Sequence, residues 1–151
     1  MIKIMLSDEV KLYFTSFQKE IVELKHELAD EKQRSYKKEQ NLLIELFETL
    51  DAFGYLLDNL KNKENPDRSI KRTIKNLESI QRKLLRILEN RGINKIEFPE
   101  NKAIFGLCKI IETQQDDELA EQTIIKIVKN GFRRGDEIIR PAEVITVKNT
   151  G

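Results

Sequence analysis

The chain has little of what an active site is built from. Its 151 residues include one cysteine, one histidine and no tryptophan. A single cysteine excludes an internal disulfide and any metal site built from several cysteines. The sequence also has no glycine-rich phosphate loop, no His/Cys cluster at metal-ligand spacing and no Ser/His/Asp set. We therefore expect no enzymatic activity, no metal and no cofactor.

Long apolar runs are also absent. No run approaches the roughly 20 residues of a membrane span, and the N-terminal MIKIMLSDEVK becomes charged too early for a signal peptide. We therefore expect a cytoplasmic protein with no membrane partner. Apolar residues make up 39% and charged residues 35% of the chain, against about 45–50% and about 25% in compact globules. The excess of charge predicts much exposed surface, and the net charge of +1 does not indicate a nucleic-acid binder.

A long helix is predicted for residues 7–60. Proline is absent from Ser7 to Leu60, and the first glycine is Gly54. Apolar residues recur at intervals of four and three in two series, the heptad pattern of a helix that pairs with another helix. Such a helix would be roughly 80 Å long, too long for its own chain to bury, so the simplest partner is a second copy. The two series are Val10, Phe14, Phe17, Ile21, Leu24 and Leu28, then Leu43, Leu46, Leu50, Phe53, Leu57 and Leu60.

A second helix should follow the break at residues 61–67. Asn65 is a candidate N-cap with Pro66 at the first helical position, and Gly92 is a candidate C-terminal stop. With so short a connection we expect this helix to fold back antiparallel on residues 43–60, and two such hairpins would form a four-helix bundle. The apolar positions of this second helix are Ile70, Ile74, Leu77, Ile80, Leu84, Ile87 and Leu88.

The remaining residues favour a small β domain. Strands are expected at 103–111, 123–128, 137–140 and 144–147, with a polar loop or short turn at 112–122. Two turn candidates contain glycine. We expect the hairpin turn at residues 134–136 and a bulge at Gly131 that bends its strand.

From Gly131 to Val147 the chain reads GFRRGDEIIRPAEVITV. This long ordered pattern resembles the C-terminal signature of the GrpE family, the nucleotide exchange factors of DnaK-type heat-shock chaperones. Two upstream segments are similar to family motifs in the same order: LFETLDAFGYLL (46–57), in which Asp51 matches an aspartate, and LLRILENRGINKI (84–96), in which Gly92 matches a glycine. Together the resemblance covers roughly residues 43–148.

The resemblance implies a homodimer in which a paired helix leads into a four-helix bundle and each chain projects a β-wing. One wing would bind the ATPase domain of a DnaK-type chaperone and open its cleft, so that ADP leaves, as part of the stress response. The segment from Phe98 to Ala103 is shorter than the family's Phe-Asp-Pro-x-x-His-Glu-Ala and lacks its histidine. The alternative is a non-enzymatic coiled-coil scaffold whose wing docks a different protein.

Several residues near the expected hairpin admit two interpretations. Pro141 forces Arg140 toward an extended conformation, so the guanidinium could be held for a partner carboxylate or could form an ion pair within the chain, with Asp136 or Glu137. Phe132 could belong to the core of the β domain or could contact a partner. The full set of predicted partner-binding residues is Val128, Phe132, Arg133, Arg134, Asp136, Glu137, Arg140 and Pro141.

Positive charge is concentrated between Lys61 and Arg91, where ten Lys and Arg residues stand against four Asp and Glu residues. No aromatic residue and no nucleic-acid-binding motif accompanies them, so we expect no nucleic-acid partner. Two interpretations of this charge remain: it lies on a solvated face of the bundle, or it attracts an acidic partner.

These arguments predict an α+β protein with a long N-terminal dimeric coiled-coil helix, a helical hairpin that forms a four-helix bundle in the dimer and a small C-terminal all-β wing. The expected domains are a stalk at 1–42, the hairpin at 43–91 and the wing at 92–151. The predicted dimerisation residues are Val10, Phe14, Phe17, Ile21, Leu24, Leu28, Leu43, Leu46, Leu50, Phe53, Leu57, Ile74, Leu77 and Leu84.

Overall fold

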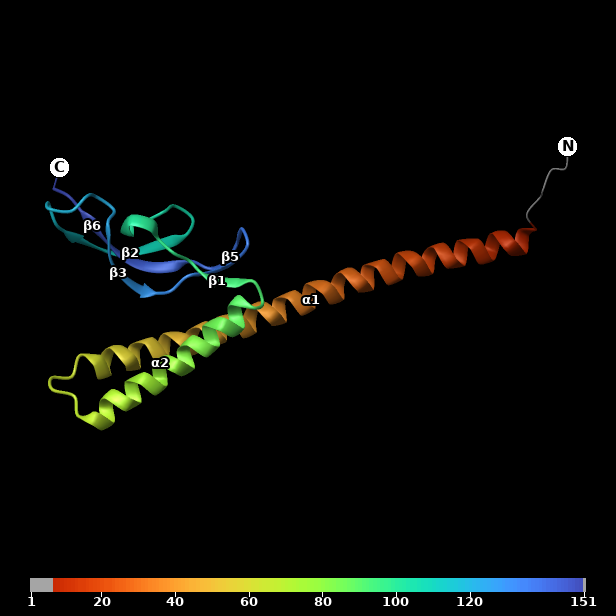
Figure 1. Cartoon of the computed structure of the whole chain (residues 1–151). Helices are drawn as coiled ribbons and strands as arrows, with labels where there is room; N and C mark the ends of the chain where they lie inside the picture. Colours follow the sequence, from red (N-terminus) through yellow and green to blue (C-terminus); the bar gives the residue numbers. More distant parts are fainter. Residues whose placement is uncertain (1–6, 151) are drawn as a thin grey trace. The chain divides into compact units, whose positions relative to one another are not determined.

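The computed structural model describes residues 7–150 and has two helices followed by short strands (Figure 1). The α+β class predicted from the sequence is confirmed. Residues 1–6 and 151, which the expected domain ranges include, lie outside the described residues. By its internal contacts the chain divides into two compact units, and the boundary along the chain lies between Leu42 and Leu43. Within the described residues, no helix combines the length and the apolar character that crossing a membrane requires.

Helix α1 spans Asp8–Lys61. The Ser7 hydroxyl accepts a hydrogen bond from the Val10 N–H at 3.4 Å, and Asp8 and Glu9 place negative charge in the first turn, where the helix dipole favours it. Gly54 does not interrupt the helix. Every side chain from residue 8 to 39 is exposed, so this part of α1 buries none of its apolar residues within the unit 1–42.

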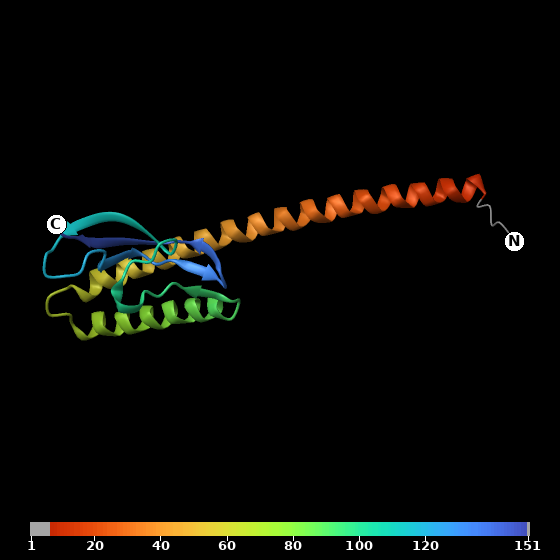
Figure 2. The same ribbon diagram turned by 90° about the horizontal axis from the view of Figure 1, so that it is seen from above.

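Helix α2 spans Arg68–Glu89 and lies antiparallel beside the C-terminal part of α1 (Figures 1 and 2). The expected cap at Asn65 is wrong. Asp67 is the N-cap, and its carboxylate accepts from the Ile70 N–H at 2.8 Å, whereas Asn65 adopts a left-handed φ of 52° in the connection. Gly92 follows the helix end with a φ of 75°, which glycine adopts without strain.

Two three-stranded sheets complete the fold. The first has the order β1-β4-β5, with β1 at Ile93–Lys95, β4 at Phe132–Arg134 and β5 at Glu137–Arg140, all antiparallel. The second has the order β2-β6-β3, with β2 at Cys108–Gln115, β6 at Ala142–Lys148 and β3 at Ile124–Lys129. In it β6 is central, parallel to β2 and antiparallel to β3. A single-turn 3-10 helix, η1, spans Pro99–Asn101.

The expected strand at 103–111 is displaced toward the C-terminus. Residues 103–107 form a turn, in which the Leu107 N–H donates to the Ile104 carbonyl and Gly106 has a φ of 83°. The polar residues 112–115, expected in a loop, instead belong to β2 and pair with β6 up to Lys148. The backbone of an edge strand forms hydrogen bonds with its one neighbouring strand whatever side chains it carries. Polar residues are therefore compatible with an exposed edge strand.

Gly131 lies between β3 and β4 and not at a bulge within a strand, which corrects the sequence-based expectation. A Cβ atom at this position would stand 2.5 Å from the Ala142 nitrogen and 2.8 Å from Ile96 Cδ1. The Gly131 carbonyl also accepts from the Ile96 N–H at 2.9 Å. The close approach of two backbone segments is therefore what requires glycine.

The core has two clusters, both within residues 43–150. The first joins α1, α2 and the β1-β4-β5 sheet and contains Leu43, Phe47, Leu50, Leu88, Ile93 and Phe132. The second lies against the β2-β6-β3 sheet and contains Ile96, Phe98, Ile124, Ala142 and Val144.

Candidate partner-binding surface

The β4–β5 hairpin places four charged residues around one turn. Arg134 pairs with Glu137 in the register, so Gly135 and Asp136 form the connection, as expected, and Gly135 has a φ of 57°. Arg133, Asp136 and Glu137 are exposed, and Arg134 is half-buried. Since successive side chains of a strand point to opposite faces, Arg133 and Arg134 present positive charge on both faces of the hairpin.

Phe132, at the base of this hairpin, belongs to the core. It is 2% exposed, and its ring stacks on that of Phe47 with a centroid distance of 4.1 Å and an interplanar angle of 6°. The structure thus places Phe132 in the core, which was one of the two interpretations that the sequence allowed. The Phe132 ring is therefore not exposed for contact with a partner.

Arg140 is bound within the chain. Its guanidinium donates to both carboxylate oxygens of Asp51, at 2.7 and 2.9 Å, and its Nε and Nη2 donate to the Asn130 carbonyl at 3.1 and 2.7 Å. The side chain is 14% exposed and lies over the Phe47 and Phe132 rings, 5.3 and 5.7 Å from their centroids. The intrachain ion pair is thus present, but its acid is Asp51 and neither Asp136 nor Glu137.

The contacts of Arg140 connect β5 to α1. A bidentate ion pair fixes both distance and orientation, and the guanidinium is further held by two aromatic faces and a carbonyl. Asp51 stood out in the sequence only through its match to a family motif. No pattern in the sequence indicated a contact between Asp51 and Arg140, because the two residues lie in different motifs.

Val128, the remaining apolar candidate, lies on the edge strand β3. It is 43% exposed and falls at an irregularity of the β3–β6 register. Ile125 and Ile111 are exposed to 43% and 44% and also lie at register shifts, on β3 and β2. Sequence reasoning did not select these two isoleucines, because β-branched apolar residues in a predicted strand indicate a core. Pro141, the last candidate, is exposed next to Arg140.

Another exposed residue that the sequence did not single out is Phe105, in the turn at 103–107. Its side chain is fully exposed, next to Gly106. A single exposed aromatic residue does not by itself mark a contact surface, which needs a contiguous apolar patch. The signal available in the sequence was the neighbouring glycine, which indicates a turn.

The predicted dimerisation residues fall into three groups by burial. Those between Val10 and Leu28 are 46–63% exposed. Leu43, Leu50 and Leu57 are buried within the chain itself, which leaves them unavailable to a second copy unless this core opens. Half-buried positions make up the rest: Leu46, Phe53, Ile74, Leu77 and Leu84.

Two carboxylates have a lowered pKa, that of the half-buried Glu78 and that of the exposed Asp117. The hydrogen bond from Lys61 at 2.7 Å, together with its positive charge, lowers the pKa of Glu78. The pKa of Asp117 is also lowered, because the Thr150 hydroxyl and N–H donate to its carboxylate at 2.8–3.0 Å. Both interactions are structural ties, the first between α1 and α2 and the second between the β2–β3 connection and the end of β6. Among residues 7–150 no group of three or more His, Cys, Asp or Glu side chains is placed to hold a metal ion.

Comparison with known proteins gives one consistent family. The family model for GrpE matches residues 7–148. Three relatives, each named Protein GrpE, illustrate the likeness. The protein of Thermotoga neapolitana is 27% identical over 121 residues, which cover 80% of this chain and 67% of the relative. That of Pseudothermotoga lettingae is 29% identical over 102 residues, covering 68% and 56%. That of Methanosarcina barkeri is 27% identical over 112 residues, covering 73% and 51%. The chain thus spans only about half the length of the last two relatives.

Proposed function

The chain belongs to the GrpE family, and from that premise we propose that it is a co-chaperone that binds the nucleotide-binding domain of a DnaK-type chaperone and promotes the release of ADP. The observation that supports this most is the anchoring of the β4–β5 hairpin. Arg140, at the end of β5, is fixed to Asp51 of α1 by two hydrogen bonds of 2.7 and 2.9 Å. A hairpin held in this way can transmit force to a partner without bending at its base.

Exchange of this kind needs binding preference and no bond chemistry. A factor that binds the open chaperone more tightly than the ADP-bound one lowers the affinity of ADP by the same ratio. Each tenfold loss of ADP affinity requires about 1.4 kcal/mol of preference. A preformed surface supplies such a preference through contacts that exist only in the open state. We propose that the charged hairpin residues Arg133, Arg134, Asp136 and Glu137 make these contacts, and that Val128 and Pro141 add further contacts.

We further propose that the protein acts in the cytoplasm as a homodimer that pairs through α1. The exposed apolar residues from Val10 to Leu28 support this, since they follow the heptad pattern and lie 46–63% exposed in the single chain. A helix segment whose apolar face is covered by nothing gains little stability in water. A second copy offers the same repeat and would cover that face along its length. In this dimer residues 1–42 would form the stalk, 43–91 the bundle and 92–151 the wing.

The test is the release of a fluorescent ADP from a DnaK-type chaperone after mixing with the full chain. We expect faster release, and we expect the double variant Arg133→Glu/Asp136→Lys to lose most of the acceleration, by about tenfold or more. A matched variant, Lys63→Glu/Glu64→Lys, carries the same changes of charge on the exposed α1–α2 connection and should act as the wild type does. A dimer that leaves ADP release unchanged would instead favour the scaffold alternative.

A further inference from the structure

The strongest charge feature outside the β sheets is a stripe of cations along α2. The helix carries seven Lys and Arg residues against two acids, Glu78 and Glu89. At 3.6 residues per turn, all seven cations fall within about 120° of the helix circumference. They are Arg68, Lys71, Arg72, Lys75, Arg82, Lys83 and Arg86, and we refer to them as the basic stripe.

The basic stripe faces solvent because the opposite side of α2 is used for packing. Leu88 belongs to the first core cluster, and Leu84 and Leu85 pack against it. All seven cations are exposed. Among the described residues none of them forms an ion pair within 4.0 Å; Glu78, the one acid beside the middle of the stripe, is paired with Lys61 at 2.7 Å. Most of the positive charge of the basic stripe is therefore not neutralised by acids of the same chain.

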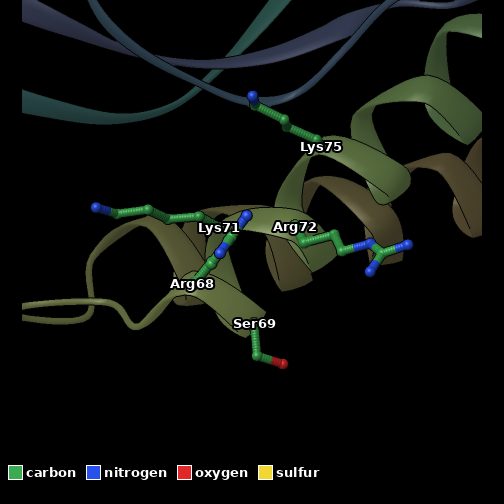
Figure 3. Close-up of a pocket in the computed structure, with 5 residues that line it drawn as sticks. All are labelled: Arg68, Ser69, Lys71, Arg72 and Lys75. Atoms are coloured by element: carbon green, nitrogen blue, oxygen red, sulfur yellow. The ribbon is translucent and has the colours of Figure 1, made fainter.

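The geometry of the cations does not suit a single small anion. An open groove of about 690 Å³ is lined by Arg68, Ser69, Lys71, Arg72 and Lys75. Figure 3 shows Lys71, Arg72 and Lys75 extending from α2 in three different directions, away from a common point. From Arg68 to Arg86 the stripe runs for about 27 Å along the helix axis. An elongated partner with many negative charges matches this surface, whereas a lone phosphate would contact only one or two of the cations.

We propose that the basic stripe of α2 is a docking surface for an acidic polypeptide segment, of the kind in which Asp or Glu alternates with apolar residues along a helix. Two exposed isoleucines at the border of the stripe favour a polypeptide over a nucleic acid. Ile80 and Ile87 are 45% and 50% exposed in the single chain and are not among the residues assigned above to the dimer. They lie three residues before and four residues after Lys83, so all three share one side of the helix. Apolar side chains there would meet apolar side chains of an acidic helix.

A single-stranded nucleic acid fits this surface less well. Proteins that bind single strands combine cations with aromatic side chains on which bases stack, and α2 contains no aromatic residue. Exposed ion pairs are individually weak, so binding to the stripe must use several cations together and must weaken as salt screens them.

The experiment measures the fluorescence anisotropy of labelled probes that are titrated with the full chain at low salt. One probe is a helical peptide with Glu and Leu in a heptad pattern, the second has Gln in place of every Glu, and the third is a single-stranded RNA of similar length. We expect saturable binding of the acidic peptide, with the other two probes weaker by about tenfold or more.

The variant Arg72→Gln/Arg82→Gln/Arg86→Gln removes three charges and keeps good helix formers. It should weaken binding of the acidic peptide by about tenfold or more. The matched variant Lys19→Gln/Lys32→Gln/Lys37→Gln removes three exposed charges from α1 and should bind as the wild type does. Circular dichroism checks that both variants keep their helices. Absence of peptide binding, equal binding of the Gln peptide or the RNA, or equal losses in the two variants would each overturn the proposal.

Discussion

The carboxylate of Asp51 and the guanidinium of Arg140, 89 residues apart in sequence, meet in a bidentate ion pair with distances of 2.7 and 2.9 Å. The two side chains are 20% and 14% exposed, and two aromatic rings lie beside the guanidinium. In this partly buried position each charge is costly without the other, because removing one partner leaves an uncompensated charge. This pair therefore joins the end of β5 to α1 and positions the hairpin between β4 and β5.

Replacing Asp51 by Asn or Arg140 by Met should destabilise the fold by about 2–4 kcal/mol, since each change leaves the opposite charge without its partner. Urea denaturation measures the loss. The double variant Asp51→Asn/Arg140→Met should lose less than the sum of the single losses, because neither charge remains. Lys129→Gln breaks a more exposed ion pair, with Glu143 at 3.8 Å, and should cost at most about 1 kcal/mol. Equal losses in Lys129→Gln and Arg140→Met would contradict the role assigned to this pair.

Two glycines should respond in opposite directions to alanine. Gly131→Ala would put a Cβ 2.5 Å from the Ala142 nitrogen, a backbone atom that cannot easily move, and should destabilise the protein by about 1–3 kcal/mol. Gly54→Ala lies inside α1 with nothing within 4 Å of the new Cβ and should stabilise it by about 0.5–1 kcal/mol. Thermal unfolding of both variants checks the signs. A Gly131→Ala protein as stable as the wild type would show that the two backbone segments are not held together.

The tie between Asp117 and Thr150 should depend on pH. The pKa of Asp117 is lowered in the folded chain by two donors of Thr150. The stabilisation from these hydrogen bonds is therefore fully present above the ordinary pKa of an aspartate. It is lost as the pH falls through the lowered pKa of Asp117 in the folded state. A carbon-detected NMR titration of Asp117 should show its midpoint rise toward the ordinary value in Thr150→Ala, which lacks the hydroxyl.

Thr15→Ala is the control for this titration, because the Thr15 hydroxyl donates to the Lys11 carbonyl in α1. It should leave the midpoint of Asp117 where it is in the wild type. A midpoint that is the same in Thr150→Ala would mean that the hydroxyl does not stabilise the carboxylate.

The proposed pairing of α1 predicts a dimer that two carboxylates in its apolar series should break. Phe17→Asp/Leu24→Asp places two charges in the exposed apolar series, where burial against a second copy would remove them from water. Sedimentation velocity should show a dimer for the wild type and a monomer for this variant. Lys19→Asp/Gln33→Asp puts the same acids on exposed positions of α1 outside the series and should stay dimeric. A wild-type chain that sediments as a monomer would refute the pairing.

The helices were predictable from the sequence because their signals are local. Heptad spacing and the absence of proline predicted both ends of α1 to within one residue. The start of α2 was misplaced because Asn65 and Asp67 are both good caps, and only the backbone of the connection, left-handed at Asn65, decides between them. The hairpin between β4 and β5 was also predictable, since a glycine between two short strands defines it.

The features that depend on distant contacts were not predictable. Residues 112–115 are too polar to indicate a strand, and they form one because β6 pairs with them. Leu43, Leu50 and Leu57 show the same spacing as the exposed apolar residues of α1, but they are buried within the chain itself. Spacing alone does not say which neighbour covers an apolar face. The partner of Arg140 was misjudged for the same reason, since nearby acids were considered and Asp51 was not.

The proposed exchange activity is tested most directly by its thermodynamic reciprocal. The measurement is the affinity of the full chain for a DnaK-type chaperone, by titration calorimetry, with and without saturating ADP. A factor that expels ADP must itself be weakened by ADP, by the same ratio by which it weakens ADP binding. We predict a loss of affinity of about tenfold or more on adding ADP. An affinity that ADP leaves unchanged would contradict the assignment, even if the two proteins bind tightly.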